Sequence, residues 1–457
     1  DGGATWTDHA ESIKRFPQGA WVPQIHVSPH DADEVYVVVN DYRRNDWRPY
    51  LYRTMDGGSS WVRLVLDGGE VTGHVLSVVQ DPEVASLLFL GTEEGLFVSF
   101  DRGANWKRWA HDVPSVPVRD MVIHPRDGDL ILGTFGRAAY VIDDLAPLRS
   151  LASEGNGLME ESLRVFAVPD AYQVNFRRHA GARFPADHYW SGANYGGGAR
   201  VQFYVHPDTA EVYEKDELEW SILNLEGDTL RNGALTAEGG IQTMRWRFDT
   251  NGMDWPQREL KKKKDQPSGG GPDVLPGKYT LAMSLGNHSS STAVTVYPDP
   301  RVPYNRQAHE ARNLHQRIAM EASKSVVDAM NEVQRMMTTI ATVKDDLKWI
   351  PDSLKEEVTA LADSLDGELT RIEEVYYQPR DYKGTGSVTE RLNSILWTAF
   401  SVTGGADAPG GNAQRALERL HTEGTAFGEE VKSIQEGLWL EWLEAAEAVD
   451  RSPSRIY

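Results

Sequence analysis

The chain has 457 residues, of which 40% are hydrophobic and 9% aromatic, so it can fill several cores and should form two to four domains. Its formal net charge of -21 is spread along the sequence apart from one lysine run, Lys261–Lys264, which argues against nucleic acid as a partner because no cationic track would displace counterions from phosphates. The chain has no cysteine, which excludes disulfides, thiolate metal sites and cysteine nucleophiles, and no apolar run of about 18 residues, so we expect no membrane span.

Residues 54–61 and 99–106 repeat the pattern Ser/Thr-x-Asp-x-Gly-x-x-Trp, and residues 1–6 are a clipped third copy. These residue types fit a hairpin turn: the aspartate accepts backbone N–H groups, the glycine takes a positive φ, and the tryptophan packs back over the hairpin. The pattern is the Asp-box of β-propellers, and the spacing of 45 residues between the two aspartates matches the period of about 40–45 residues for four-stranded blades. The box residues are Asp1, Trp6, Thr54, Asp56, Gly58, Trp61, Ser99, Asp101, Gly103 and Trp106.

We expect the Asp-box carboxylates to serve the fold and not catalysis. A carboxylate that accepts local backbone hydrogen bonds has no lone pairs left to act as an acid or a base. Asp-boxes also occur in sialidases and other propeller glycosidases, so the motif alone leaves a glycan site open.

Residues 1–150 are predicted to form about three carboxy-terminal blades of an Asp-box propeller. Short alternating strands are broken by polar turns throughout this region. A closed propeller needs roughly four to eight blades, so we expect the chain to start inside a propeller that a further chain segment or a protein partner completes. The expected strands are 24–27, 34–40, 50–54, 61–66, 75–80, 87–91, 96–100, 106–110, 118–124, 130–134 and 138–142.

Two loops of this region carry side chains of the kinds that bind ligands. Residues 41–48 contain Tyr42, Arg43, Arg44 and Trp47, a composition that suits carbohydrate stacking or a protein contact, because rings and guanidinium groups give a large contact area at small entropy cost. An ordinary surface loop is the alternative. Residues 30–34, His-Asp-Ala-Asp-Glu, offer Ca²⁺ ligands but lack the spacing and pivot glycine of a dedicated site, which favours a solvated turn, so we expect no metal and no other cofactor.

Beyond the strands, residues 151–198 form an expected connector and residues 199–300 an expected immunoglobulin-like β-sandwich. Its predicted strands are 200–205, 218–223, 240–248, 277–285 and 291–297. Residues 301–457 then show apolar positions at spacings of three and four, and we expect an antiparallel bundle of three or four helices. The fold class is therefore multidomain, mainly β and then α.

Three segments of the chain resemble one family of bacterial proteins. They are 133–148, which reads Gly-Thr-Phe-Gly-Arg-Ala-Ala-Tyr-Val-Ile-Asp-Asp-Leu-Ala-Pro-Leu, then 274–279, and Asp299-Pro300-Arg301. Together with the Asp-boxes they are similar to the carboxy-terminal half of secreted sortilin-type or BNR-repeat proteins labelled glycosyl hydrolase. The resemblance implies the order propeller, sandwich and helical tail, and a secreted, cell-surface or periplasmic location. This chain has Phe135 where histidine is common in that family.

The motif that ends the propeller in this family includes Gly136, Arg137, Asp143 and Asp144. The two aspartates are candidates for an acid pair or a cation site, but adjacent residues of a strand point to opposite faces, so both cannot reach one sugar. A bridge from Arg137 to an aspartate that closes the blade is the favoured interpretation.

No Ser-His-Asp, HExxH, P-loop or dinucleotide motif appears in the sequence. The favoured function is therefore a non-catalytic secreted or cell-surface module for binding or assembly. The alternative is a propeller glycoside hydrolase, sialidase-like or glucanase-like, whose catalytic carboxylates lie partly in the missing blades. A receptor for peptides or sorting signals of the sortilin kind is a third hypothesis, and a glycan or a peptide is the corresponding ligand.

Overall fold

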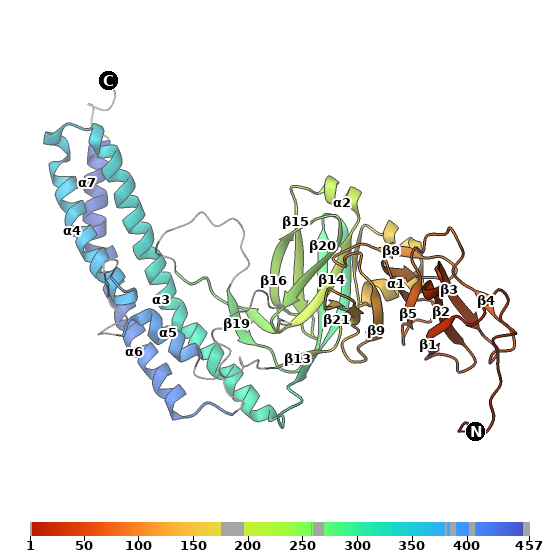
Figure 1. The fold of residues 1–457 in the computed structure, drawn as a ribbon. Helices are drawn as coiled ribbons and strands as arrows, with labels where there is room; N and C mark the ends of the chain where they lie inside the picture. The colour runs from red at the N-terminus through yellow and green to blue at the C-terminus, as the bar shows by residue number, and fades with distance from the viewer. Residues whose placement is uncertain are drawn as a thin grey trace.

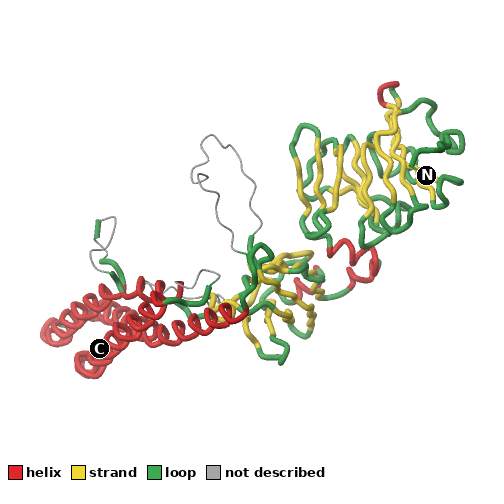
Figure 2. Tube along the Cα trace, turned by 90° about the horizontal axis from the view of Figure 1, so that it is seen from below, coloured by secondary structure: helices red, strands yellow, loops and turns green. Residues whose placement is uncertain are grey.

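The computed structural model describes residues 2–174, 196–256, 258, 269–379, 382–383, 390–401 and 407–450. Asp1 of the clipped Asp-box, the lysine run 261–264 and residues 175–195 of the expected connector lie outside them. The sheets come first along the chain and the helices last, and the helices form a long bundle that extends away from the sheets (Figure 1 and Figure 2). Within the described ranges, no helix has both the length and the apolar character that a bilayer crossing requires.

The first 142 residues form three antiparallel sheets that follow one another along the chain. The strand orders are β1-β2-β3-β4, β5-β6-β7-β8 and β11-β10-β9, so each sheet is a meander in which neighbours in sequence are neighbours in space. We call them the first, second and third sheet. The strands are β1 (Trp21–Val27), β2 (Val35–Asp41), β3 (Asp46–Thr54), β4 (Val62–Arg63), β5 (Val75–Gln80), β6 (Leu88–Thr92), β7 (Gly95–Ser99), β8 (Lys107–Trp109), β9 (Val118–Ile123), β10 (Leu130–Thr134) and β11 (Ala139–Ile142).

The three sheets pack face to face through alternate residues of their strands. In the second sheet Val79, Phe89 and Val98 lie side by side across β5, β6 and β7, and they share a buried core with Met121 and Leu132 of the third sheet. The residues between them point to the opposite face, where they join a second core with the first sheet. Both faces of the second sheet are therefore apolar and covered.

Polar side chains join the inner strands of neighbouring sheets. The backbone N–H of Val78 donates to Gln24 Oε1 over 2.6 Å, and that of Gln80 donates to His26 Nε2 over 3.2 Å. Ser77 Oγ donates in turn to the backbone oxygen of Val118 over 3.1 Å. Because β5 and β9 are edge strands of their sheets, these bonds satisfy backbone groups that would otherwise lack a partner.

An ion pair between a buried glutamate and a partly exposed arginine also links the first two sheets. Glu34 is 0% exposed, and its carboxylate accepts from the Tyr36 hydroxyl over 2.9 Å and pairs with Arg102 over 3.2 Å. Arg102 belongs to the second Asp-box, and its backbone oxygen accepts from Arg53 over 2.8 Å. The Asp-box turn of one sheet is thus anchored on the sheet before it.

Two further sheets share one core after the third sheet. Their orders are β12-β14-β17 and β13-β21-β20-β15-β16, and a short pair, β18-β19, lies beside them. The five strands expected here form, but β12, β13, β16, β18 and β19 were not predicted, and β12 and β13 lie within the expected connector. β16 contains Gly and Asn, which are poor strand formers. The strands are β12 (Leu163–Val165), β13 (Ala171–Gln173), β14 (Ala199–Val205), β15 (Glu217–Leu223), β16 (Thr229–Thr236), β17 (Gly240–Trp246), β18 (Asp249–Asn251), β19 (Gly270–Asp273), β20 (Gly277–Leu285) and β21 (His288–Pro298).

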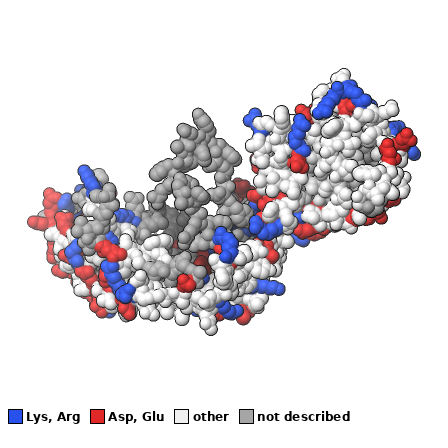
Figure 3. Space-filling view, turned by 60° about the horizontal axis from the view of Figure 1, so that its bottom comes forward, with Lys and Arg blue, Asp and Glu red and all other residues white. Residues whose placement is uncertain are grey.

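The helices pack around one core, as the three-and-four spacing predicts. Gly424 lets two of them approach closely, since a Cβ at this position would lie 2.8 Å from Val326 Cγ2. Acidic side chains gather over the helical end of the face shown in Figure 3. The helices are α3 (Arg306–Asp346), α4 (Asp352–Tyr376), α5 (Leu392–Ser401), α6 (Gly411–Ile434) and α7 (Leu440–Asp450), with a π-helical turn (Gln435–Trp439) between the last two.

We predict that Phe89→Ala destabilises the sheet region by about 3–5 kcal/mol, because it opens a cavity between the second and third sheets. Phe89 is 0% exposed, whereas Val62 is 58% exposed, so Val62→Ala is the matched control and should change stability by less than about 0.5 kcal/mol. Urea unfolding followed by tryptophan fluorescence measures both. Equal unfolding midpoints for the two variants would contradict the packing described here.

Candidate functional site

The loop between β2 and β3 is held in one shape by its own residues. A short 3-10 turn, η1 (Tyr42–Arg44), ends at Asn45, whose φ of 65° is left-handed, a conformation that asparagine tolerates better than most residues. Arg44 donates to Asp41 over 2.8 Å and to the backbone oxygen of Gln18 over 2.6 Å. Arg44 therefore ties the loop to the amino-terminal segment, while its side chain remains 53% exposed.

Three rings of this region form a cluster. Tyr42 stacks on His74 with ring centroids 4.5 Å apart, and Trp47 meets the same imidazole edge-on at 5.7 Å. His74 is 2% exposed, and its buried Nδ1 has no hydrogen-bond partner among the residues that the structure describes, while Nε2 lies 3.6 Å from Glu93. Burial lowers the pKa of His74, although the Glu93 carboxylate opposes the shift, so the imidazole is neutral near pH 7.

Trp47 is a fixed but accessible side chain. Its indole N–H donates to Asn45 Oδ1 over 3.0 Å, and its ring contacts Tyr42 and His74. The side chain is nevertheless 54% exposed. Nearby, the Arg43 guanidinium lies 5.2 Å from the ring centre of Trp21 and 5.7 Å from that of Tyr42. An ordered, half-exposed aromatic surface of this kind costs little entropy when a ligand binds.

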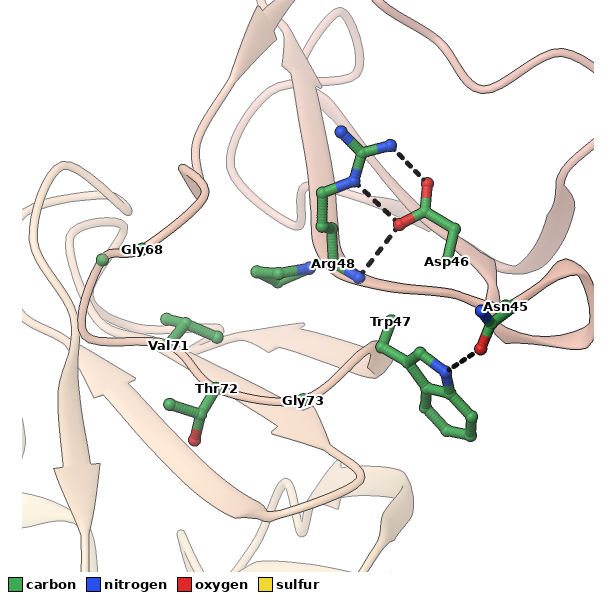
Figure 4. Close-up of a pocket in the computed structure, with 10 residues that line it drawn as sticks. Asn45, Asp46, Trp47, Arg48, Gly68, Val71, Thr72 and Gly73 are labelled. Carbon is green, nitrogen blue, oxygen red and sulfur yellow. Dashed lines mark hydrogen bonds and ion pairs between the residues drawn. The ribbon is translucent and has the colours of Figure 1, made fainter.

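An open pocket of about 600 Å³ adjoins Trp47 (Figure 4). One wall is the start of β3 and the other is the glycine-containing segment before β5, in which Gly68 and Gly73 have positive φ values of 72° and 73°. Neither this second wall nor His74 is indicated by the sequence around Trp47, since both lie more than twenty residues after it. The pocket is lined by Asn45, Asp46, Trp47, Arg48, Pro49, Gly68, Gly69, Val71, Thr72 and Gly73.

Asp46 is the one acidic residue among those that line this pocket in the described part of the chain. Arg48 holds it with two bonds of 2.8 and 2.6 Å, and the Tyr50 hydroxyl donates to it over 2.8 Å (Figure 4 shows the arginine bonds). The hydrogen bonds from Arg48 keep the pKa of Asp46 well below its ordinary value, while burial raises the pKa of Tyr50 to about 12. An aspartate in this state is a poor general acid.

The carboxylate of the first Asp-box accepts hydrogen bonds from residues of its own turn. Asp56 accepts from the Thr54 hydroxyl over 2.8 Å, and from the backbone N–H and hydroxyl of Ser60 over 2.8 and 2.6 Å. The Thr54 oxygen accepts in turn from the Gly58 N–H over 2.9 Å. The bonds from Ser60 lower the pKa of Asp56.

The second Asp-box repeats this network with different residue types. Asp101 accepts from the Ser99 hydroxyl and the Asn105 N–H, both over 2.8 Å, and from Asn105 Nδ2 over 2.6 Å. Ser99 Oγ accepts from the Gly103 N–H over 2.8 Å. The shared geometry shows that the spacing of the motif, and not one side chain, defines the turn.

The box tryptophans differ in their environment. Trp106 is 6% exposed in the core between the first two sheets. Trp61 donates its indole N–H to the Gly58 oxygen over 3.0 Å, and Trp6 makes the same bond to Gly3 over 3.1 Å. Trp6 is nevertheless 90% exposed, because the clipped third copy lies on no sheet of the described residues.

The motif at 136–144 joins the third sheet to β14 of the sheets that follow. Asp143 pairs with Arg200 of β14 over 2.7 Å, so the partner of this aspartate is Arg200 and not the expected Arg137, which lies exposed after Gly136 in the turn between β10 and β11. The Gln202 amide donates to the Asp144 backbone oxygen over 3.0 Å.

Asp144 has its own structural role. Its backbone φ is 54°, and its carboxylate accepts from the Ala146 N–H over 3.1 Å at the start of α1 (Ala146–Glu154). Burial raises the pKa of this side chain. The two adjacent aspartates therefore serve different contacts, although both lie after the end of β11 and not on a strand, so strand alternation is not the reason.

The residues of the segment 30–34 go to separate partners. His30 Nε2 lies 2.8 Å from the Asp81 backbone oxygen, Asp31 accepts from the Asp33 N–H over 3.0 Å, and Glu34 is the buried ion-pair partner described above. Across the described residues, no three His, Asp or Glu side chains are grouped so that they would hold a metal ion.

Comparison with known proteins gives partial and weak similarities. No family model matches the chain. The chain is 27% identical over 150 residues to the vacuolar protein sorting/targeting protein 10 of Aspergillus clavatus. This match covers 28% of the chain and a tenth of that protein's length. It supports in part the resemblance to sortilin-type proteins.

Solved structures give low scores. YCF48 bound to D1 peptide has a TM-score of 0.22 and 12% identity, covering 64% of this chain and 73% of that one. The GH74 enzyme of Niastella koreensis has a TM-score of 0.24, 15% identity and coverages of 60% and 46%. The GH74 xyloglucanase of Xanthomonas campestris has a TM-score of 0.23, 15% identity and coverages of 63% and 40%. Likenesses with scores this low support no conclusion about the fold or the activity of this chain.

We predict that Asp101→Ala destabilises the second sheet by about 1 kcal/mol at pH 7, because three hydrogen bonds of the turn are lost. Partial burial acts to raise the pKa of Asp101, but the bonds from Asn105 and Ser99 outweigh it and hold the pKa below the ordinary value. The folded pKa thus lies below the unfolded one, so the stabilisation is complete above about pH 4 and is lost as the pH falls through the folded pKa.

The difference in unfolding midpoint between Asp101→Ala and the unmodified chain should therefore shrink below about pH 4. Urea unfolding at pH 7 and pH 3 measures it. Glu70→Ala, at an exposed position before β5, is the control and should leave the midpoint nearly unchanged at both pH values. A difference that stays constant with pH would show that the charged carboxylate is not what stabilises the turn.

Proposed function

We propose that this chain is a non-catalytic module for binding and assembly, built on consecutive blades of an Asp-box β-propeller. Two four-stranded meanders support this architecture. In each of them an Asp-box turn precedes the last strand. In the same proposal the two sheets that share a core form an immunoglobulin-like sandwich, the helices form a carboxy-terminal bundle, and the protein works outside the cytoplasm, at the cell surface or in the periplasm.

The binding function is inferred from the pocket at Trp47, where an ordered indole ring remains exposed. The indole is held by one hydrogen bond and two ring contacts, yet 54% of its surface is exposed. The acid beside it, Asp46, is fixed by Arg48 and has a lowered pKa. This combination offers a ready contact surface and hydrogen-bonding groups, but not the proton donor that hydrolysis requires.

The pocket suits a ligand with one apolar face and polar edges. A sugar ring or a peptide side chain can lie on the indole, while Arg48 and Asp46 present donor and acceptor groups at the rim. Because Arg48 and Asp46 neutralise each other, the proposal favours an uncharged group at this position. A glycan and a peptide are the two ligand classes to be compared.

The alternative is a propeller glycoside hydrolase. Such an enzyme needs two carboxyl groups at a separation of about 5–5.5 Å for a retaining mechanism or roughly 6.5–9.5 Å for an inverting one. One of them would have to lie in blades beyond the three sheets described here. Release of reducing sugar from any glycan by this chain would favour the hydrolase and contradict the non-catalytic proposal.

We predict that Trp47→Ala weakens ligand binding at least tenfold, because a central aromatic contact is lost. A glycan array and a peptide array identify the ligand class, and calorimetry then gives the dissociation constants. Trp397→Ala is the matched control, since Trp397 is 63% exposed on α5 in the helical region, and it should leave the affinity unchanged. Binding that Trp47→Ala does not weaken would place the ligand elsewhere.

A further inference from the structure

The three amino-terminal sheets share one edge, which we call the rim. Asn40, which pairs with Trp21 at the start of β1, donates its side-chain amide to the Val75 oxygen at the start of β5 over 3.1 Å. Ser77 Oγ donates to the oxygen of Val118, the first residue of β9. The starts of these three strands therefore lie next to one another. The loops β2–β3, β6–β7 and β10–β11 return at the same ends of their sheets and complete the rim.

The first sheet contributes a stacked guanidinium group to the rim. Arg43 lies between the rings of Trp21 and Tyr42, and Trp21 is 57% exposed. Arg43 is exposed as well, and among the described residues it has no hydrogen bond and no ion pair, whereas Arg44 and Arg48 are paired with aspartates. A guanidinium group that rests on ring faces keeps its N–H edge available for an anion.

The third sheet repeats this arrangement with unrelated residues. The Arg119 guanidinium lies 5.2 Å from the ring centre of Phe135, which is 65% exposed. The turn that carries Phe135 is fixed, because the N–H and hydroxyl of Thr134 donate to the Ala138 oxygen over 3.1 and 2.5 Å and the Phe135 N–H donates to the Pro117 oxygen over 2.9 Å. Within the part of the chain that the structure describes, Arg119 has no hydrogen bond and no ion pair.

His74 of the second sheet lies between the two clusters. Tyr42 and Trp47 pack on its ring from the first sheet. Burial lowers the pKa of His74, Glu93 opposes the shift, and the charge of Arg119 adds to it, so Arg119 approaches the same imidazole from the third sheet. The rings and stacked cations of the rim thus form one continuous surface.

The charges along the rim follow a definite order. Arg43 stands at one end and Arg119 at the other. Between them lie the neutralised Arg48–Asp46 pair beside Trp47 and the carboxylates of the β6–β7 turn, Glu93 and Glu94. A complementary ligand carries acidic groups toward its ends and an uncharged group in its middle. The chain as a whole has a net charge of -21, which repels polyanions elsewhere.

The spacing of the sheets sets the size of such a ligand. Sheets that pack face to face lie about 10 Å apart, so Trp47 of the first sheet and Phe135 of the third are separated by about 20 Å. A ligand that contacts both rings is therefore an oligomer and not a single sugar or side chain.

The rim fits a polysaccharide better than a peptide. Extended peptides usually add to a strand edge or fill an apolar groove, and in the described residues the rim consists of turns whose backbone groups bond to one another, as in Asn45 N–H to Tyr42 oxygen and Glu93 N–H to His74 oxygen. Sugar rings instead lie on exposed aromatic faces. The carboxylate of a uronic acid accepts two parallel hydrogen bonds from a guanidinium group.

We propose that the rim binds an acidic polysaccharide in which uronic acids alternate with uncharged sugars. An uncharged sugar lies on Trp47, uronate carboxylates pair with Arg43 and Arg119, and a further sugar lies on Phe135. This inference rests on the binding function proposed for Trp47 and names the ligand of that site.

Hyaluronan tests the proposal, because glucuronate and N-acetylglucosamine alternate along it. Calorimetry compares hyaluronan oligosaccharides with the same oligosaccharides after reduction of their carboxyl groups, and with polyglutamate. We expect hyaluronan to bind at least about tenfold more tightly than its reduced form, since the charge-assisted bonds are absent from the latter. This difference should shrink at high salt, which screens exposed ion pairs, and polyglutamate should not bind.

Variants at the two ends of the rim locate the ligand. Arg43→Gln and Arg119→Gln should each weaken hyaluronan binding about tenfold and leave the affinity for the reduced form unchanged, which also shows that the variants fold. Phe135→Ala should weaken binding of both forms. Arg126→Gln is the matched control, since Arg126 is 69% exposed in the turn between β9 and β10, at the opposite end of the third sheet.

Several outcomes would overturn the proposal. Equal affinity for hyaluronan and its reduced form refutes the acidic ligand, and tighter binding of polyglutamate refutes the polysaccharide. Hyaluronan binding that survives both Arg119→Gln and Phe135→Ala shows that the ligand does not cross the rim. If another ligand binds in a Trp47-dependent manner and hyaluronan does not, this inference alone fails. If no glycan or peptide binds, the proposed binding function fails with it.

Discussion

Each sheet of the amino-terminal region has apolar residues on both faces, so each sheet needs a covering layer on both sides. All residues of β5, β6 and β7 are buried, which is possible only because the second sheet lies between two others. The first and third sheets have another sheet on one side only. The amino-terminal segment covers part of the outer face of the first sheet, while Ile25 of β1 and Val122 and Val141 of the third sheet remain exposed. Sheets of this kind are stable in a stack or a ring and not alone.

The same constraint explains how the polar groups are used. Carboxylates of the Asp-boxes hold turns, Glu34 holds a neighbouring turn through Arg102, and Asp143 holds the sandwich through Arg200. The Asp-box carboxylates bond within their own turns, whereas Glu34 and Asp143 each join one sheet to the next. Buried charges are tolerated only with such partners, so the acids of this region serve architecture, and the pocket at Trp47 depends on rings and on a neutralised pair.

The sequence predicted the strands well because their signal is local. Alternation of apolar residues and the turn residues between strands place β1 to β11 within a few positions of the observed bounds. Helices α3 to α7 follow equally from spacings of three and four. The shortened β4 and the unexpected β16 show the limit of this signal, since pairing with a neighbour, and not the segment itself, decides the length of a short strand.

The candidate site was predicted only in part. Tyr42 and Trp47 were identified from composition, but His74 and the glycine-containing wall were not, and Arg44 proved to be an anchor for the loop. Nothing in the residues around position 42 indicates which later segment will lie against them. The predicted Arg137 bridge was replaced by Arg200 for the same reason, since the partner comes from a strand more than fifty residues later.

The sequence by itself determined the local units: the Asp-box turns, the two-faced strands, the amphipathic helices and the absence of thiol chemistry. Each depends on residues within one turn or one strand, where short-range sterics and hydrogen bonds decide the conformation. Only the tertiary structure decided which charges meet, which ring is exposed beside the pocket and which sheet faces are bare. Those features depend on packing between segments far apart in the chain, and packing energy is a property of the contact and not of either segment.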